Sequence, residues 1–143
     1  MEHMTIWFRK ITTEDLNRRG KGTLADIMGI EFVDITGDSM TATMPVIDSN
    51  KLPIGILHGG ANVVLAETIA STAANAVVNL EKCYCVGLEI NANHIRSVRE
   101  GVVTATTRPI HIGRTTHVWH IDIYNEDGKQ TRVSRMTASV VSR

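Results

Sequence analysis

The stretch GGANVVLAETIASTAANAVVNL, residues 59–80, decides the fold, because no other segment of the chain has the length and periodicity of a long helix. Its only formally charged side chain is Glu67. At 100° per residue the apolar side chains gather in one sector, which contains Ala66, Ile69, Ala70, Ala73, Ala76 and Val77. The opposite sector contains Glu67, Thr68, Ser71, Thr72, Asn75 and Asn79. The spacing predicts a helix from residue 60 to about residue 80 with one buried apolar face.

The segments on either side of this helix are typical of strands. β-branched, alternating residues separated by turn residues predict a hairpin before the helix and a run of long strands after it. A short helix and a helical turn are expected near the N-terminus, where Thr12 and the acidic residues after it suggest a helix start. The expected strands are 30–35, 39–46, 84–98, 102–112, 116–124 and 131–141. This order predicts an α+β fold, in which an antiparallel sheet is wrapped around one long central helix.

Length and composition indicate one globular domain over residues 1–143, with residues 1–29 as an N-terminal extension that carries the short helices. Fifteen Lys and Arg balance fifteen Asp and Glu, which argues against a nucleic-acid partner or a membrane surface. Cys83 and Cys85 are too close in sequence for an ordinary structural disulfide and are expected to be free thiols. We therefore expect a cytoplasmic protein that starts at Met1 or Met4.

The polar face of the long helix suggests chemistry. A solvent face usually carries Lys, Arg and several Glu, whereas this face has small hydroxyl and amide side chains and a single carboxylate. Packing against another copy of the chain explains this better than plain exposure. A carboxylate in such surroundings is a stronger base than one on an open surface, as a general base or nucleophile must be. Gly59 and Gly60 open the same helix and leave backbone N–H groups that can hold an oxyanion.

Three motifs carry a resemblance over nearly the whole chain: GILHGG at 55–60, LAET at 65–68 and VGLEINANHIR at 86–96. They resemble the hotdog-fold acyl-CoA thioesterases. Within that family they are most similar to the PaaI-like branch, which holds the 4-hydroxybenzoyl-CoA, 1,4-dihydroxy-2-naphthoyl-CoA and enterobactin-proofreading thioesterases. The resemblance implies dimers joined edge to edge through their sheets, usually paired into tetramers. It also implies active sites between protomers and an acyl-CoA or carrier-protein thioester as substrate.

The resemblance also implies roles for individual residues. Glu67 is implied as the catalytic carboxylate, acting as general base or as nucleophile, and the N–H of Gly59 would polarise the thioester carbonyl. His58 would lie against the thioester or the water, and Ser71 would help to position the water. The implied contacts to coenzyme A phosphates are His94, Arg96 and the turn residues Gly113, Arg114 and Thr115.

One position departs from the family pattern. Close relatives have a glutamine a few residues before His58, where this chain has Leu52. Either Asn50 takes over the role of the glutamine with a shifted loop, or the carbonyl is held by backbone alone. The departure bears on rate and substrate preference rather than on the class of reaction.

Other readings of the sequence stay open. A non-catalytic hotdog protein that binds acyl-CoA is the main alternative, since the fold alone does not determine the chemistry. A hotdog hydratase would need a different carboxylate and histidine pattern. No cofactor beyond the coenzyme A of the substrate is expected. His111, His117 and His120 do not have zinc-ligand spacing, so no metal site is expected.

Overall fold

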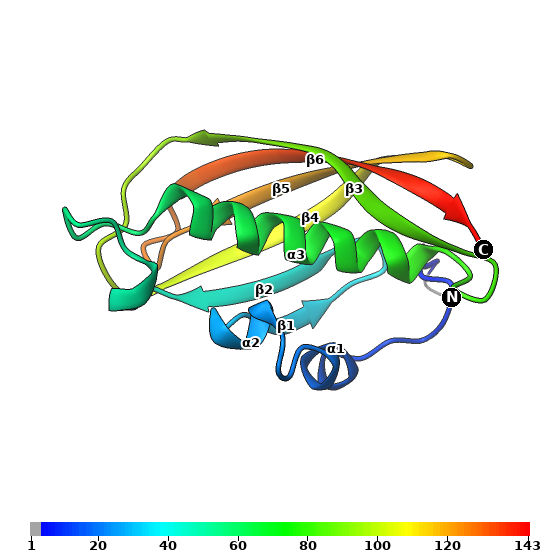
Figure 1. The fold of residues 1–143 in the computed structure, drawn as a ribbon, viewed down its shortest axis with the longest axis horizontal. Helices are drawn as coiled ribbons and strands as arrows, with labels where there is room; N and C mark the ends of the chain where they lie inside the picture. Colours follow the sequence, from blue (N-terminus) through cyan, green and yellow to red (C-terminus); the bar gives the residue numbers. More distant parts are fainter. Residues whose placement is uncertain (1–3) are drawn as a thin grey trace.

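A single sheet of six antiparallel strands curves around one long helix, α3 (Gly59–Val77), in the computed structural model of this protein, which describes residues 4–143 (Figure 1). The strand order across the sheet is β1-β2-β4-β5-β6-β3. The architecture confirms the predicted α+β fold. The strands are β1 (Glu31–Ile35), β2 (Met40–Pro45), β3 (Cys83–His94), β4 (Val102–Ile112), β5 (Thr116–Tyr124) and β6 (Gln130–Ser142).

The N-terminal segment packs as an outer layer and is anchored by a tryptophan pair. Helices α1 (Thr13–Arg19) and α2 (Leu24–Ile27) precede β1, and the predicted cap of α1 is present, because the Asp15 N–H donates to Thr12 Oγ1 at 3.1 Å. Trp7 stacks on the fully buried Trp119, with ring centroids 6.4 Å apart. The Trp7 Nε1 donates to the Thr36 carbonyl at 2.7 Å, so the single polar group of the indole also has a partner.

Helix α3 supplies the centre of the core. Leu65, Ala66, Ile69, Ala70 and Ala73 are fully buried, which confirms the predicted apolar face. The small alanines allow the sheet to approach the helix backbone closely. Helix α3 ends at Val77, earlier than expected. Val78 is extended, with φ −103° and ψ 158°.

Asn79 lies in the turn after the helix and not on its polar face, as the sequence pattern had suggested. Its side-chain oxygen accepts from the Glu81 N–H at 3.1 Å, and its carbonyl accepts from the Lys82 and Cys83 N–H groups. The local turn therefore competes successfully with another helical turn at this position.

The edge strand β3 is also shorter than predicted, ending at His94 rather than near residue 98. Beyond His94 the N–H groups of Ile95 and Arg96 both donate to the Thr131 carbonyl, so the regular ladder stops. The chain then turns toward the start of α3, where the Val98 carbonyl accepts from the Leu57 N–H at 2.7 Å. This departure from the sheet brings Arg96 to the N-terminus of the central helix.

Candidate active site

The first turn of α3 leaves one backbone donor free. The Gly60 N–H donates to His58 Nδ1 at 2.8 Å, and the Ala61 and Asn62 N–H groups both donate to the His58 carbonyl. Among residues 4–143 the N–H of Gly59 has no hydrogen-bond partner. Four N–H groups have no intrahelical partner at the start of an α-helix. Here two of them, those of Gly60 and Ala61, donate to His58, and the N–H of His58 itself donates to the Asn50 carbonyl. The remaining donor, at the positive end of the helix, is the one that the sequence singled out.

A cavity of about 280 Å³ lies at this end of the helix and brings four of the predicted site residues together. Leu52, Gly59, His94 and Arg96 all line it. The His94 ring lies directly over Gly59, because a Cβ built on Gly59 would be 3.0 Å from its Cε1 and 3.1 Å from its Nε2. The glycine at this position therefore gives the imidazole room to lie against the helix terminus.

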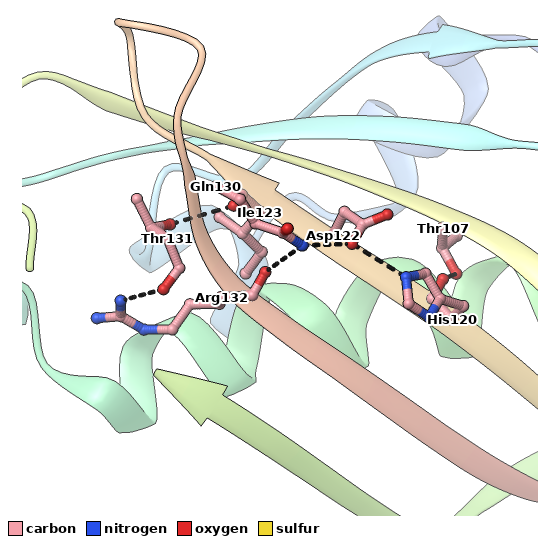
Figure 2. A network of polar contacts seen from close by, with 7 residues as sticks. All are labelled: Thr107, His120, Asp122, Ile123, Gln130, Thr131 and Arg132. Atoms are coloured by element: carbon pink, nitrogen blue, oxygen red, sulfur yellow. Dashed lines mark hydrogen bonds and ion pairs between the residues drawn. The ribbon is translucent and has the colours of Figure 1, made fainter. Parts of the chain in front are cut away.

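Arg132, on β6, lines the same cavity, although no sequence pattern indicated it. It is only 4% exposed and pairs with His94 across the β3–β6 ladder. Figure 2 shows its guanidinium beside the Thr131 carbonyl, which accepts from Nη1 at 2.7 Å. Nη1 also donates to the Arg96 carbonyl. No carboxylate in the described part of the chain lies within ion-pair distance of it.

The Arg132 guanidinium also reaches the start of α3. In the amide orientation that satisfies both partners, Asn62 Oδ1 accepts from Nε at 3.2 Å and from Nη2 at 3.1 Å. Arg132 therefore ties the end of β3 to the first turn of the central helix and places a buried positive charge next to the cavity. An Arg on a strand gives no local signal of such a role, since its partners lie far away in sequence.

The surroundings of His94 disfavour the charged form of its imidazole. Burial lowers its pKa below the ordinary value, and the positive charge of Arg132 lowers it further. A neutral imidazole can donate or accept one hydrogen bond but offers no charge to a phosphate. Beside the helix terminus His94 is placed to make a polar contact through its ring nitrogens, and the phosphate contact that the resemblance implies stays a prediction.

Asn50 is engaged inside its own loop, which contains the short helix η1 (Asp48–Asn50). Its Oδ1 accepts from the Ile47 N–H at 2.9 Å, and its Nδ2 donates to the Pro45 carbonyl at 2.9 Å. Its carbonyl accepts from the His58 N–H, so the loop and the helix start are fixed together. Asn50 is buried and shapes the loop, while Leu52 is the residue whose side chain reaches the cavity.

Glu67 and Ser71 lie further along α3, away from this cavity. The Glu67 side chain is exposed in the protomer and its carboxylate rests against Gly87 of the edge strand β3. Ser71 lines a separate cavity of about 580 Å³ between α3 and the N-terminal segment. The desolvation expected for the carboxylate is therefore absent from the single chain and would have to come from a second protomer.

The polar face of α3 is only partly available to a partner. Asn75 faces β3, where its Oδ1 accepts from the Cys85 N–H at 2.8 Å and its Nδ2 donates to the Cys85 carbonyl at 3.1 Å. The Thr72 hydroxyl donates to the Thr68 carbonyl at 2.7 Å. Glu67, Thr68 and Ser71 are the members of this face whose side chains make no hydrogen bond among the described residues.

The turn between β4 and β5 lies far from His94 and Arg96 within one protomer. Thr116 is level with Ser139 of β6 and His94 is level with Arg132 of the same strand, seven residues away, which corresponds to about 23 Å. One phosphate group cannot contact both places in one protomer. The Gly113 N–H is also already used, since it donates to the Thr116 carbonyl at 2.9 Å. Of the turn residues, Arg114 and Thr115 have exposed side chains.

Residues 4–143 contain no cluster of three or more His, Cys, Asp or Glu that could hold a metal ion. No helix in this part of the chain is long and apolar enough to cross a membrane.

Comparison with known proteins identifies the family. The model of the thioesterase superfamily matches residues 54–132. The chain is 47% identical over 136 residues to the 1,4-dihydroxy-2-naphthoyl-CoA hydrolase of Escherichia coli, covering 95% of this chain and 99% of that protein. A solved Pseudomonas aeruginosa thioesterase, carrying a Gln-to-Ala change, matches with a TM-score of 0.95 and 46% identity over 97% of this chain and 100% of that one.

A Staphylococcus aureus thioesterase gives a more local comparison. It is 38% identical and was solved with a glutamate replaced in one structure and a glutamine in another, with TM-scores of 0.81 and 0.80. The matches cover 84% and 82% of this chain and 99% and 98% of those chains. The two replaced positions are fifteen residues apart, the same spacing as between Leu52 and Glu67. Fold, site and similarity together lead to one conclusion: the chain belongs to the thioesterase superfamily and is a hotdog-fold thioester hydrolase.

Proposed function

We propose that the protein hydrolyses an aryl- or enoyl-type acyl-CoA thioester to the free acid and the thiol. In this proposal Glu67 is the general base or the nucleophile, and the Gly59 N–H polarises the thioester carbonyl. The observation that carries it is the single free donor at the start of α3, on the same helix as one exposed carboxylate. A donor aimed at a developing oxyanion and a carboxylate that activates water are the two elements that thioester hydrolysis requires.

The spacing of the two groups supports a site shared between protomers. Gly59 and Glu67 are eight positions apart on one straight helix, so their backbones are about 12 Å apart along its axis. A carbonyl held by the Gly59 N–H is therefore beyond the reach of the carboxylate of the same chain. We propose that Glu67 acts on a thioester held by Gly59 of the partner chain, in a homodimer that pairs further into a tetramer.

Both chemical routes remain available to Glu67. As a general base, the carboxylate takes a proton from water, the resulting hydroxide adds to the carbonyl carbon, and the C–S bond breaks as the oxyanion collapses. As a nucleophile, the carboxylate adds to the carbonyl and expels the thiolate, and water then hydrolyses the mixed anhydride. In both routes the Gly59 N–H stabilises the oxyanion, and the leaving thiolate takes up a proton from solvent.

His58 and Ser71 have supporting roles in the proposal. Because His58 Nδ1 accepts from the Gly60 N–H, the neutral ring carries its proton on Nε2 and can donate it to the thioester or to the water. Ser71 is one turn after Glu67, and its hydroxyl is available to position the water. Neither residue needs to carry a charge for these roles.

The contacts to coenzyme A divide into two groups. We assign Leu52, His94 and Arg96 to the thioester end, because they surround the cavity beside the free N–H. Arg114 and Thr115 remain the proposed phosphate contacts, since Arg114 makes no ion pair in the described part of the chain and can bind a phosphate with two hydrogen bonds. A carrier-protein thioester would present the same pantetheine but lack the nucleotide. An Arg114→Ala substitution should therefore weaken the hydrolysis of a coenzyme A thioester and leave that of a carrier-protein thioester unchanged.

The test is thiol release from a panel of aryl, enoyl and aliphatic acyl-CoAs, followed with a chromogenic disulfide. Glu67→Gln keeps the shape of the side chain and removes only its basicity, so we expect turnover to fall by about 10²- to 10⁴-fold. Glu100→Gln is the matched control, because Glu100 is exposed in a turn, and it should leave turnover unchanged. Absence of turnover on every panel member, with acyl-CoA binding retained in both variants, would instead favour the acyl-CoA-binding protein.

A further inference from the structure

The Glu67 carboxylate occupies space that exists only because residue 87 is a glycine. A Cβ built on Gly87 would lie 2.8 Å from Glu67 Oε1 and 3.8 Å from its Cδ. The other near neighbour of that Cβ would be Met136 Sδ, at an ordinary contact distance of 3.9 Å. Of these neighbours, only the carboxylate would have to move if residue 87 carried a side chain.

Hydrogen bonds hold α3 and β3 at this close distance. Asn75, two turns after Glu67 on the same side of the helix, bonds through its amide to both backbone groups of Cys85. Cys85 is two residues before Gly87 on β3. The ladder between β3 and β6 shifts register between Gly87 and Glu89, so the edge strand is irregular where the carboxylate rests. Because the backbones are tied together beside the contact, the strand cannot retreat from a new side chain.

Glycine inside a strand weakens it and often marks a place where another group approaches closely. We propose that Gly87 is a positioning residue, whose missing side chain determines where the Glu67 carboxylate lies relative to the thioester. The inference rests on the proposed function and deepens it. Gly87 does not touch the substrate in this proposal; it acts by setting the position of the carboxylate.

The direct test is Gly87→Ala. The carboxylate oxygen must move by about 0.6 Å or more to restore an ordinary contact, and a misplacement of about 1 Å can lower a rate by about 100-fold. We expect kcat to fall by about tenfold to 100-fold, with KM nearly unchanged. The thermal unfolding midpoint should stay the same or rise, because Ala suits a strand better than Gly. Lower activity with equal or higher stability is a result that a purely structural role would not produce.

Two further variants make the test specific. In Glu67→Asp the carboxylate is one methylene closer to the helix, away from the space over Gly87. Adding Gly87→Ala to it should therefore cause little further loss of kcat, so the two substitutions should be strongly non-additive. Gly20→Ala is the matched control, because its new Cβ would have no neighbour closer than 3.6 Å, and its kcat should equal that of the wild type.

The possible results distinguish a wrong role for Gly87 from a wrong function. Full activity of Gly87→Ala, or an equal loss in the wild-type and Glu67→Asp backgrounds, would overturn the positioning role while leaving the function intact. A fall in the unfolding midpoint that parallels the loss of activity would also overturn it. If Glu67→Gln retains wild-type turnover, the proposed function itself is wrong, and the role of Gly87 is rejected with it.

Discussion

Replacing Gly59 by proline would remove the one free N–H of the helix start and add a Cβ against the His94 ring. Proline is favoured at the first position of a helix, and His58, with φ −62° and ψ 134°, already has the extended conformation that a residue before proline requires. Gly59→Ala is the matched control, since it adds the same Cβ against the His94 ring and keeps the N–H. The difference between the two variants isolates the backbone donor.

The expected magnitude follows from the hydrogen bonds of the first turn. The N–H groups of the next three residues are satisfied by His58, so no neighbouring donor can take over. Loss of one oxyanion donor lowers kcat by about 10²- to 10³-fold, or about 2.7–4 kcal/mol of transition-state stabilisation. We expect this difference between Gly59→Pro and Gly59→Ala in thiol release from the best acyl-CoA. Equal kcat values for the two folded variants would refute the role of this N–H.

The same variant tests whether the site is shared between chains. In a dimer of one Gly59→Pro chain and one Glu67→Gln chain, one of the two shared sites has an intact Gly59 and an intact Glu67. Mixing the two inactive proteins through reversible unfolding should then restore activity at about a quarter of all sites. Mixtures that stay as inactive as the separate variants would show that each chain uses its own Gly59 and Glu67.

Two other substitutions test the cavity and the core. Leu52→Gln should raise kcat by up to about tenfold. Hydrogen bonds to Gly55 and Ile56 hold the Leu52 backbone in place, so the new side-chain amide would enter the cavity and could form a hydrogen bond with the substrate. An unchanged or lower kcat would contradict this expectation. Burial, and secondarily the charge of a neighbouring histidine, lowers the pKa of His117, so its neutral form contributes stability above about pH 6.5 that is lost as the pH falls below that value. His117→Asn keeps an acceptor for the Trp119 Nε1 donor. Denaturant unfolding at about pH 7.5 and about pH 5.5 should show that the free energy of unfolding falls less between these two pH values in the variant than in the wild type. An equal fall in both proteins would argue against His117 as the titrating group.

Local sequence patterns determined the secondary structure and the fold class. The helical period with a single charge predicted α3 and its buried face, and alternation predicted β5, whose His117 and His120 lie on opposite faces as expected. Such patterns depend on residues within a few positions of each other, which is why they can be read without a structure. The presence of Gly59 and of one carboxylate two turns later on the same helix was equally visible in the sequence.

Only the tertiary structure decided which groups are free and which are engaged. The amide of Asn50 and that of Asn75 look available in the sequence, yet each is used within the protomer by backbone groups of its surroundings. The glycine in β3 could be noticed as unusual, but the reason for it, the Glu67 carboxylate, is twenty positions away in sequence. Arg132 likewise meets the start of α3 only through the register of β6 with β3. Contacts of this kind depend on which distant segments the folded sheet brings together, and no local pattern encodes that.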